Sequence, residues 1–198
     1  MENKNVKASI VNSIKTIDIV QVSLMAAMAF VVTMVTQIPY GQNAVVHLGD
    51  AVVFIAALMF GKKKGFIAAA FGMFLFDLST PYAVWAPVTF IAKGMMAYIA
   101  GTIAFRKDYE GDNLWNNILA CTLGGIFMIV AYYVGGIIIN TFILSSGSGT
   151  TAMSRIYANS VSELINIPGN IIQTLVGTII ALPLVKILKK SKVIRGNN

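Results

Sequence analysis

Charge, cysteine and histidine are all scarce in this chain. Only 12% of its 198 residues are charged, whereas a typical soluble domain carries about 25%. The single cysteine, Cys121, excludes a disulfide within one chain and a cysteine metal cluster, and the single histidine, His47, excludes a histidine-rich metal site. We therefore predict no metal site and almost no soluble mass.

Nucleotide-binding and catalytic motifs are also missing. The sequence has no G-x-x-x-x-G-K-[ST] phosphate loop, and the turn 61–65 does not satisfy that pattern. Proteolysis by two intramembrane aspartates usually needs G-x-G-D, where this chain reads His47-Leu48-Gly49-Asp50. No paired constellation supports an enzyme, so we predict no catalytic residues and no cofactor on this chain. Any ATP chemistry would belong to a partner.

Long apolar runs take the place of these features. Hydrophobic residues make up 57% of the chain, and runs long enough to cross roughly 30 Å of hydrocarbon recur along it. The sequence predicts an all-α integral membrane protein, a single membrane domain over 1–198 with six transmembrane helices. The predicted segments are 17–38, 44–60, 66–78, 83–105, 114–144 and 168–188. The first is too long for a typical signal-peptide core, so we expect it to be retained.

Positive charge gathers at every second boundary between these segments. Thirteen of the 15 Lys and Arg residues fall in four clusters. The clusters are Lys4, Lys7 and Lys15; Lys62, Lys63 and Lys64; Arg106 and Lys107; and Lys186, Lys189, Lys190, Lys192 and Arg195. Cytoplasmic loops collect Lys and Arg, so the pattern predicts that both termini are cytoplasmic. The net charge of +7 reflects topology and anionic lipid better than nucleic acid.

Polar and aromatic residues approach the opposite, outer side from several segments. Ionisable groups at membrane depth cost about 2.5–3.5 kcal/mol, so they face protein or water. We predict a polar pocket with aromatic walls that opens to the exterior. Its candidate substrate-binding residues are His47, Asp50, Asp77, Tyr82, Trp85, Lys93, Tyr133, Asn140, Glu163, Asn166, Asn170 and Gln173.

Several of these residues also suit a purely structural role. Pairing of Lys93 with Asp50 or Asp77 would neutralise a buried charge, and it is compatible with a ligand role. Trp85 and Tyr82 also suit the aromatic belt of a membrane interface. Asp50 also suits an N-cap of the second segment.

The last outer stretch has alternatives of the same kind. Glu163 and Arg155 also suit exposed loop charges. Asn170 and Gln173, about one turn apart, also suit hydrogen bonds between helices. The sequence leaves open which of these polar groups contact a ligand and which contact each other.

The pattern as a whole resembles the substrate-binding S component of energy-coupling factor (ECF) vitamin transporters. The likeness rests on six segments, cytoplasmic ends and the absence of a nucleotide motif. It is strongest in the stretches 47–54, 61–65 and 77–94. The resemblance implies capture of a water-soluble vitamin or precursor at a bacterial cell membrane. It also implies a transmembrane coupling subunit and two ATPase subunits that hydrolyse ATP as partners.

The resemblance also implies a docking patch on the first segment. The family uses a pattern like A-x-x-x-A there, and this chain has Ser23, Ala26 and Ala27, with Ser23 in place of the first alanine. Small residues four apart permit close contact between helices. We predict that this patch meets the coupling subunit.

The sequence does not name the vitamin. A small aromatic compound such as pyridoxine, hydroxymethylpyrimidine or riboflavin would stack on Trp85 or a tyrosine. The alternative is a self-sufficient secondary transporter or channel, which would need a coupling-ion site and usually an internal repeat, and neither is visible. A small lipid-modifying enzyme would need a catalytic motif that the chain lacks.

Overall fold

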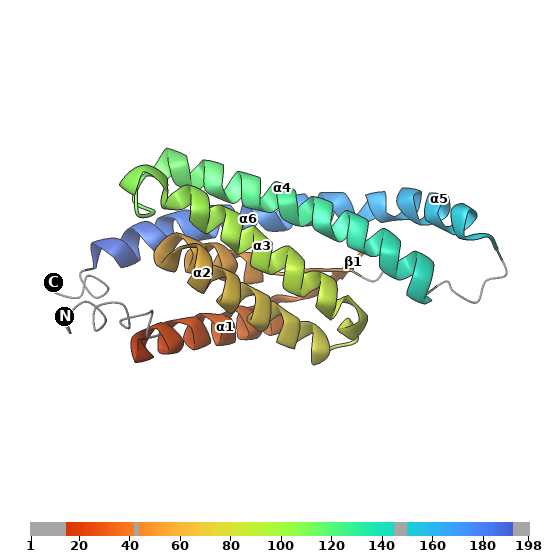
Figure 1. Cartoon of the computed structure of the whole chain (residues 1–198), viewed down its shortest axis with the longest axis horizontal. Helices are drawn as coiled ribbons and strands as arrows, with labels where there is room; N and C mark the ends of the chain where they lie inside the picture. Colours follow the sequence, from red (N-terminus) through yellow and green to blue (C-terminus); the bar gives the residue numbers. More distant parts are fainter. Residues whose placement is uncertain (1–14, 42–43, 145–149, 192–198) are drawn as a thin grey trace, which may run out of the picture.

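The computed structural model describes residues 15–41, 44–144 and 150–191, which form a helical bundle with one small hairpin (Figure 1). Lys4, Lys7, Lys192, Arg195 and the predicted loop residues 145–149 lie outside the described residues. The helices are α1 (Thr16–Thr36), α2 (Gly49–Leu78), α3 (Ala86–Ala104), α4 (Leu114–Ile139), α5 (Ala152–Glu163) and α6 (Ile167–Lys190). The central element is α2, which packs against α1, α3 and α6.

The helix α2 contains both the second and the third predicted segments. It is broken at Gly61, whose φ of 75° lies in the left-handed region that glycine adopts readily. A Cβ on Gly65 would lie only 2.8 Å from the Cα of Ala57, although eight residues of straight helix span about 12 Å. The chain therefore folds back at Gly61, and the two halves of α2 pack against each other.

Within the described part of the chain, four helical stretches are long and apolar enough to cross a membrane. They are Thr16–Thr36, Ala83–Ala104, Leu114–Leu144 and Ala152–Lys190. α2 is not among them, and it carries Lys62, Lys63 and Lys64 near its middle. Six crossings and the direction of the termini therefore stay predictions.

A hairpin replaces the predicted start of the second segment. The strands β1 (Ile38–Tyr40) and β2 (Ala44–Val46) pair antiparallel, with Ile38 opposite Val46. The prediction that a helix begins at residue 44 is therefore wrong, because the β-branched residues of β2 pair with β1 and the helix begins only at Gly49. This hairpin lies beside α6.

The polar stretch before the last segment is helical rather than an open loop. α5 begins after Thr151, whose hydroxyl accepts a hydrogen bond from the Ser154 backbone N–H at 3.3 Å. The preceding predicted segment, 114–144, is regular only to Ile139 and ends in a π-helical turn over Asn140–Leu144. Polar side chains at the end of α4 and on α5 are therefore in contact with each other.

The described members of the basic clusters gather at one end of the bundle. Lys64 forms an ion pair with Asp18 at the start of α1, and Lys62 lies 5.8 Å from the centre of the Tyr98 ring near the end of α3. Lys189 near the end of α6 donates to the backbone oxygen of Glu110. The start of α1 and the end of α6 lie at the same, left-hand end in Figure 1. This clustering agrees with the charge pattern, which predicts that this end faces the cytoplasm.

Candidate functional site

A pocket opens at the end of the bundle away from the basic clusters. It contains about 600 Å³ of space between protein atoms, part of it open to solvent. Nine of the 12 predicted site residues line it: His47, Asp77, Tyr82, Trp85, Tyr133, Glu163, Asn166, Asn170 and Gln173. Asp50, Lys93 and Asn140 do not line it. Sequence reasoning missed Ala44, Val45, Met73, Thr89, Tyr132 and Ile167 on its wall.

Aromatic side chains form one wall of the pocket. Trp85, in the 3-10 turn before α3, is only 7% exposed, and its ring centre lies 6.4 Å from that of Tyr132 on α4. Tyr82 stacks on Phe76. Trp85 therefore points into the bundle and is not an exposed belt residue. Tyr132 could have been found from its place beside Tyr133 in the middle of an apolar helix.

Two buried polar atoms on the pocket wall have no hydrogen-bond partner among the described residues. They are the Trp85 Nε1 donor and the Asp77 Oδ2 acceptor. The Asp77 carboxylate does accept from the Thr89 hydroxyl, which itself accepts from the Tyr132 hydroxyl at 3.1 Å. Buried polar groups are nearly always paired. The pocket therefore offers one donor and one acceptor to a bound molecule.

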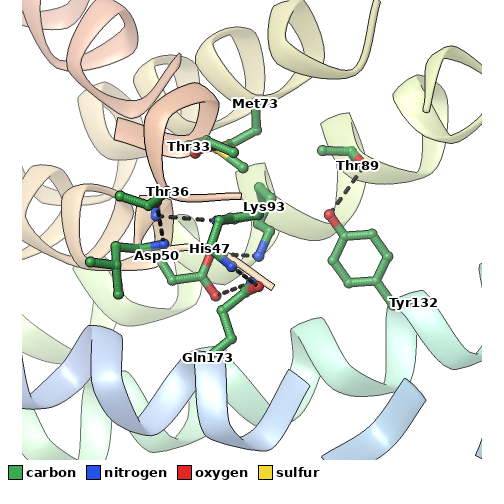
Figure 2. A network of polar contacts seen from close by, with 11 residues as sticks. Thr33, Thr36, His47, Asp50, Met73, Thr89, Lys93, Tyr132 and Gln173 are labelled. Atoms are coloured by element: carbon green, nitrogen blue, oxygen red, sulfur yellow. Dashed lines mark hydrogen bonds and ion pairs between the residues drawn. The ribbon is translucent and has the colours of Figure 1, made fainter. Parts of the chain in front are cut away.

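A charged network beside the pocket joins three helices (Figure 2). Lys93 Nζ on α3 lies 2.5 Å from Asp50 Oδ1 on α2, and both side chains are fully buried. Gln173 on α6 donates through Nε2 to Asp50 Oδ2 at 2.9 Å. The pairing of Lys93 with Asp50 is thus confirmed. Asp50 is not an N-cap, because it lies inside the first turn and Leu48 precedes the helix.

The same glutamine fixes His47, which lies between β2 and α2. Gln173 Oε1 accepts from the His47 backbone N–H at 3.1 Å, and His47 Nδ1 accepts from the Gly49 N–H at 3.1 Å. Burial, assisted by the positive charge of Lys93, lowers the pKa of His47 to about 3. The ring is therefore neutral at physiological pH, and the proton is assigned to Nε2.

Glu163, at the end of α5, is buried rather than an exposed loop charge. It is 3% exposed, and its carboxylate accepts from Asn140 Nδ2 at 2.5 Å and from Asn166 Nδ2 at 2.9 Å. Asn140 therefore supports the wall of the pocket through Glu163. Arg155, by contrast, donates to the Thr150 backbone oxygen and does not line the pocket.

The match to a known family decides the class of this protein. Residues 13–190 match the family model of the ECF-type riboflavin transporter S component. The chain belongs to this family. Its members are membrane transport subunits that bind vitamins and work with a coupling subunit and ATPases, not enzymes.

Two further proteins are similar in sequence to this S component. The thiamine precursor transporter HmpT of Lactococcus lactis subsp. cremoris (strain MG1363) is 25% identical over 199 residues, covering 99% of this chain and 96% of the relative. An uncharacterized protein in gap 3'region of Pyrococcus woesei is 32% identical over 104 residues, which cover 52% of this chain and 66% of that protein.

Two solved structures share the fold of this S component. The S component of a bacterial ECF transporter superposes with a TM-score of 0.64 at 22% identity, covering 87% of this chain and 95% of that one. The S component for biotin from an ECF-type ABC transporter gives a TM-score of 0.55 at 20% identity, covering 96% and 95%. The helical arrangement in Figure 1 is therefore the S-component fold.

The predicted docking residues of the S component lie on α1 but do not all face the same way. Ser23 and Ala27 are exposed, together with larger apolar neighbours such as Leu24 and Val31. Ala26 is half-buried, and its backbone oxygen lies 2.5 Å from where a Cβ on Gly72 would stand. Ser23 and Ala27 are thus open to a partner, whereas Ala26 packs on α2.

Proposed function

We propose that this S component captures a small aromatic vitamin or vitamin precursor from outside the cell and delivers it inward with an ATP-driven coupling module. Hydroxymethylpyrimidine, pyridoxine and riboflavin are the candidate substrates. The names of the matched family and of the L. lactis relative, riboflavin and a thiamine precursor, support this class. Both names refer to compounds with heteroaromatic rings that carry polar groups at their edges.

The pairing of an aromatic wall with two unpartnered polar atoms carries this proposal. A flat ring can stack against Trp85 or Tyr132, where aromatic contacts contribute about 0.5–1.5 kcal/mol beyond burial. An acceptor on the ring edge would receive the Trp85 Nε1–H, and a hydroxyl or amino donor would bind Asp77 Oδ2. A substrate without hydrogen-bonding groups would leave both atoms unpaired.

We further propose the orientation and partners that this function needs. The basic end faces the cytoplasm of a bacterial cell, both termini lie there, and the pocket opens outward. All six predicted segments cross the membrane, with the two halves of α2 as separate crossings. A transmembrane coupling subunit docks on α1 at Ser23, Ala26 and Ala27. Two ATPase subunits hydrolyse the ATP, and no cofactor resides on this chain.

Titration of the purified chain with each candidate vitamin tests the substrate class. Quenching of tryptophan fluorescence in detergent should report one of hydroxymethylpyrimidine, pyridoxine or riboflavin with a Kd below about 1 μM, which corresponds to a binding free energy of about 8.2 kcal/mol. Biotin serves as the non-aromatic control. Absence of binding by all three aromatic compounds, or tighter binding of biotin, would contradict the proposal.

Reconstitution of the chain alone tests the need for a coupling module. Liposomes that contain only this S component should bind the vitamin and should not accumulate it. Accumulation without ATPase subunits would favour the self-sufficient transporter instead.

A further inference from the structure

A second cavity lies at the basic end of the bundle, between the start of α4 and the end of α6. It contains about 1030 Å³, including space open to solvent. Its wall consists of Gly111, Asp112, Leu114, Asn117, Leu182, Val185, Lys186, Lys189 and Lys190. None of these residues belongs to the vitamin pocket or to the predicted docking patch on α1.

The charge of this cavity is positive. Three lysines face one carboxylate, Asp112, which already lies 3.4 Å from Lys189 Nζ. Lys186 and Lys190 are exposed and form no ion pair or hydrogen bond within the described part of the chain. The start of α4, capped by Asn113, adds the positive end of a helix dipole. The cavity is therefore suited to an anion.

Asn117 adds a buried acceptor to the same cavity. The residue is 5% exposed, and its Nδ2 donates to the Gly111 backbone oxygen at 2.7 Å, which fixes the orientation of the amide. Its Oδ1 has no partner among the described residues. A buried acceptor of this kind needs a donor, such as a hydroxyl group. A simple inorganic anion would not satisfy it, whereas an anion that carries hydroxyl groups would.

Exposed apolar side chains also lie on α4 and α6, the two helices that form the cavity. Leu114 on its wall is 50% exposed, and Trp115 beside it is 80% exposed. On α4, Ile126 is 52% exposed, and on α6 Ile179 is 69% exposed. Exposed tryptophan is typical of the membrane–water interface. With the basic end at the membrane surface, the cavity would lie at the level of the headgroups, and exposed apolar residues of α4 and α6 would be available to acyl chains.

We propose that this cavity binds the headgroup of one anionic glycerophospholipid. The phosphate lies between Lys186 and Lys190, a headgroup hydroxyl donates to Asn117 Oδ1, and the acyl chains follow α4 and α6. Charge complementarity with anionic lipid and the apolar track both support a lipid over a soluble anion. The inference requires that the chain spans a membrane and is independent of which vitamin the pocket takes.

Native mass spectrometry of the purified full chain tests this site. Phosphatidylglycerol and phosphatidylcholine with the same acyl chains are titrated against wild type, against Lys186→Gln/Lys190→Gln, and against Lys62→Gln/Lys63→Gln as a control with the same change of charge at the same end. Wild type should retain one phosphatidylglycerol at least tenfold more tightly than phosphatidylcholine. The Lys186→Gln/Lys190→Gln variant should lose this preference, because each lysine near an anionic lipid adds to the attraction. The Lys62→Gln/Lys63→Gln control should keep it. Equal loss in both variants, or no preference in wild type, would overturn the proposal.

Two further arms separate the headgroup from general charge and from soluble anions. Leu114→Glu places a carboxylate on the cavity wall at a helix position where acidic residues are favoured, so the fold should hold. It should weaken phosphatidylglycerol binding about tenfold relative to Leu114→Gln. Glycerol phosphate without acyl chains should not displace the lipid at millimolar concentration. Displacement would assign the cavity to a soluble anion, and an unchanged affinity in Leu114→Glu would place the lipid elsewhere. Vitamin titration of the same samples shows whether the outer pocket is intact.

Discussion

Lys93 and Asp50 form a fully buried ion pair that joins α3 to α2, with Nζ 2.5 Å from Oδ1. Gln173 extends the pair to α6, and its other amide atom holds the backbone of His47 at the pocket (Figure 2). Neither charged residue lines the pocket. We therefore expect them to affect substrate binding indirectly, because they hold residues that do line the pocket.

Removal of one member of this pair should destabilise the protein strongly. Lys93→Met leaves the Asp50 carboxylate buried without a cation, and breaking a buried pair in this way costs about 3–5 kcal/mol. The double variant Lys93→Met/Asp50→Asn should recover most of the loss, because neither charge of the pair remains. Thermal unfolding in detergent measures both. Additive losses in the double variant would show that the two residues do not act as a pair.

The amide of Gln173 provides a test with no change in size. Gln173→Glu replaces the donor to Asp50 Oδ2 by a second carboxylate oxygen. Repulsion between the two carboxylates should lower the melting temperature and weaken vitamin binding at least tenfold. Gln173→Leu removes this hydrogen bond and also the one from the His47 backbone N–H, adds no charge, and should have a smaller effect. A Leu variant as weak as the Glu variant would argue against repulsion as the cause.

The hydropathy of the segments and the order of the charges along the chain predicted most of the helices. The bounds of α1, α3 and α6 agree with the sequence to within a few residues, because long apolar runs have few other ways to fold in a membrane. The hairpin β1–β2 and the helix α5 were not predicted. Short polar or β-branched stretches carry weak local signals, and both elements depend on contacts with α6 and α4.

The pocket was predictable as a region, but the role of each residue was not. Polar residues at one end of several segments pointed to it, and most of them line it. The burial of Glu163 follows from Asn140 and Asn166, which reach it from the π-helical turn after α4 and from the turn before α6. Lys93 does not line the pocket because its side chain is paired with Asp50. Side-chain pairing between helices far apart in the sequence has no signature in a single sequence.

The neutral form of His47 makes stability dependent on pH. Its pKa is about 3 in the folded protein and about 6.5 in an unfolded chain. The unfolded state therefore binds more protons between these values, and this contribution to stability is present above pH 6.5 and is lost as the pH falls toward 3. The melting temperature should fall between pH 7 and pH 4 by more in wild type than in His47→Gln. Equal slopes would show that His47 is protonated in both states or in neither.

The docking proposal predicts a variant that separates binding from transport. Ala27→Phe enlarges an exposed position on α1 and should block uptake in cells that contain the coupling module, because close helix contact needs small residues. Vitamin binding by the purified protein should not change. Val130→Phe, at an exposed position on α4, is the control and should retain most uptake. Normal uptake by Ala27→Phe would remove α1 from the docking interface.

The identity of the ligand that co-purifies with the protein tests the central claim most directly. Native mass spectrometry of wild type should show one bound heteroaromatic vitamin or precursor. Trp85→Ala should lose it and should bind the added compound at least about tenfold more weakly, a loss of about 1.4 kcal/mol. Trp115→Phe, at the basic end, should retain it. An aliphatic ligand in wild type, or full retention of the aromatic ligand by Trp85→Ala, would contradict the account.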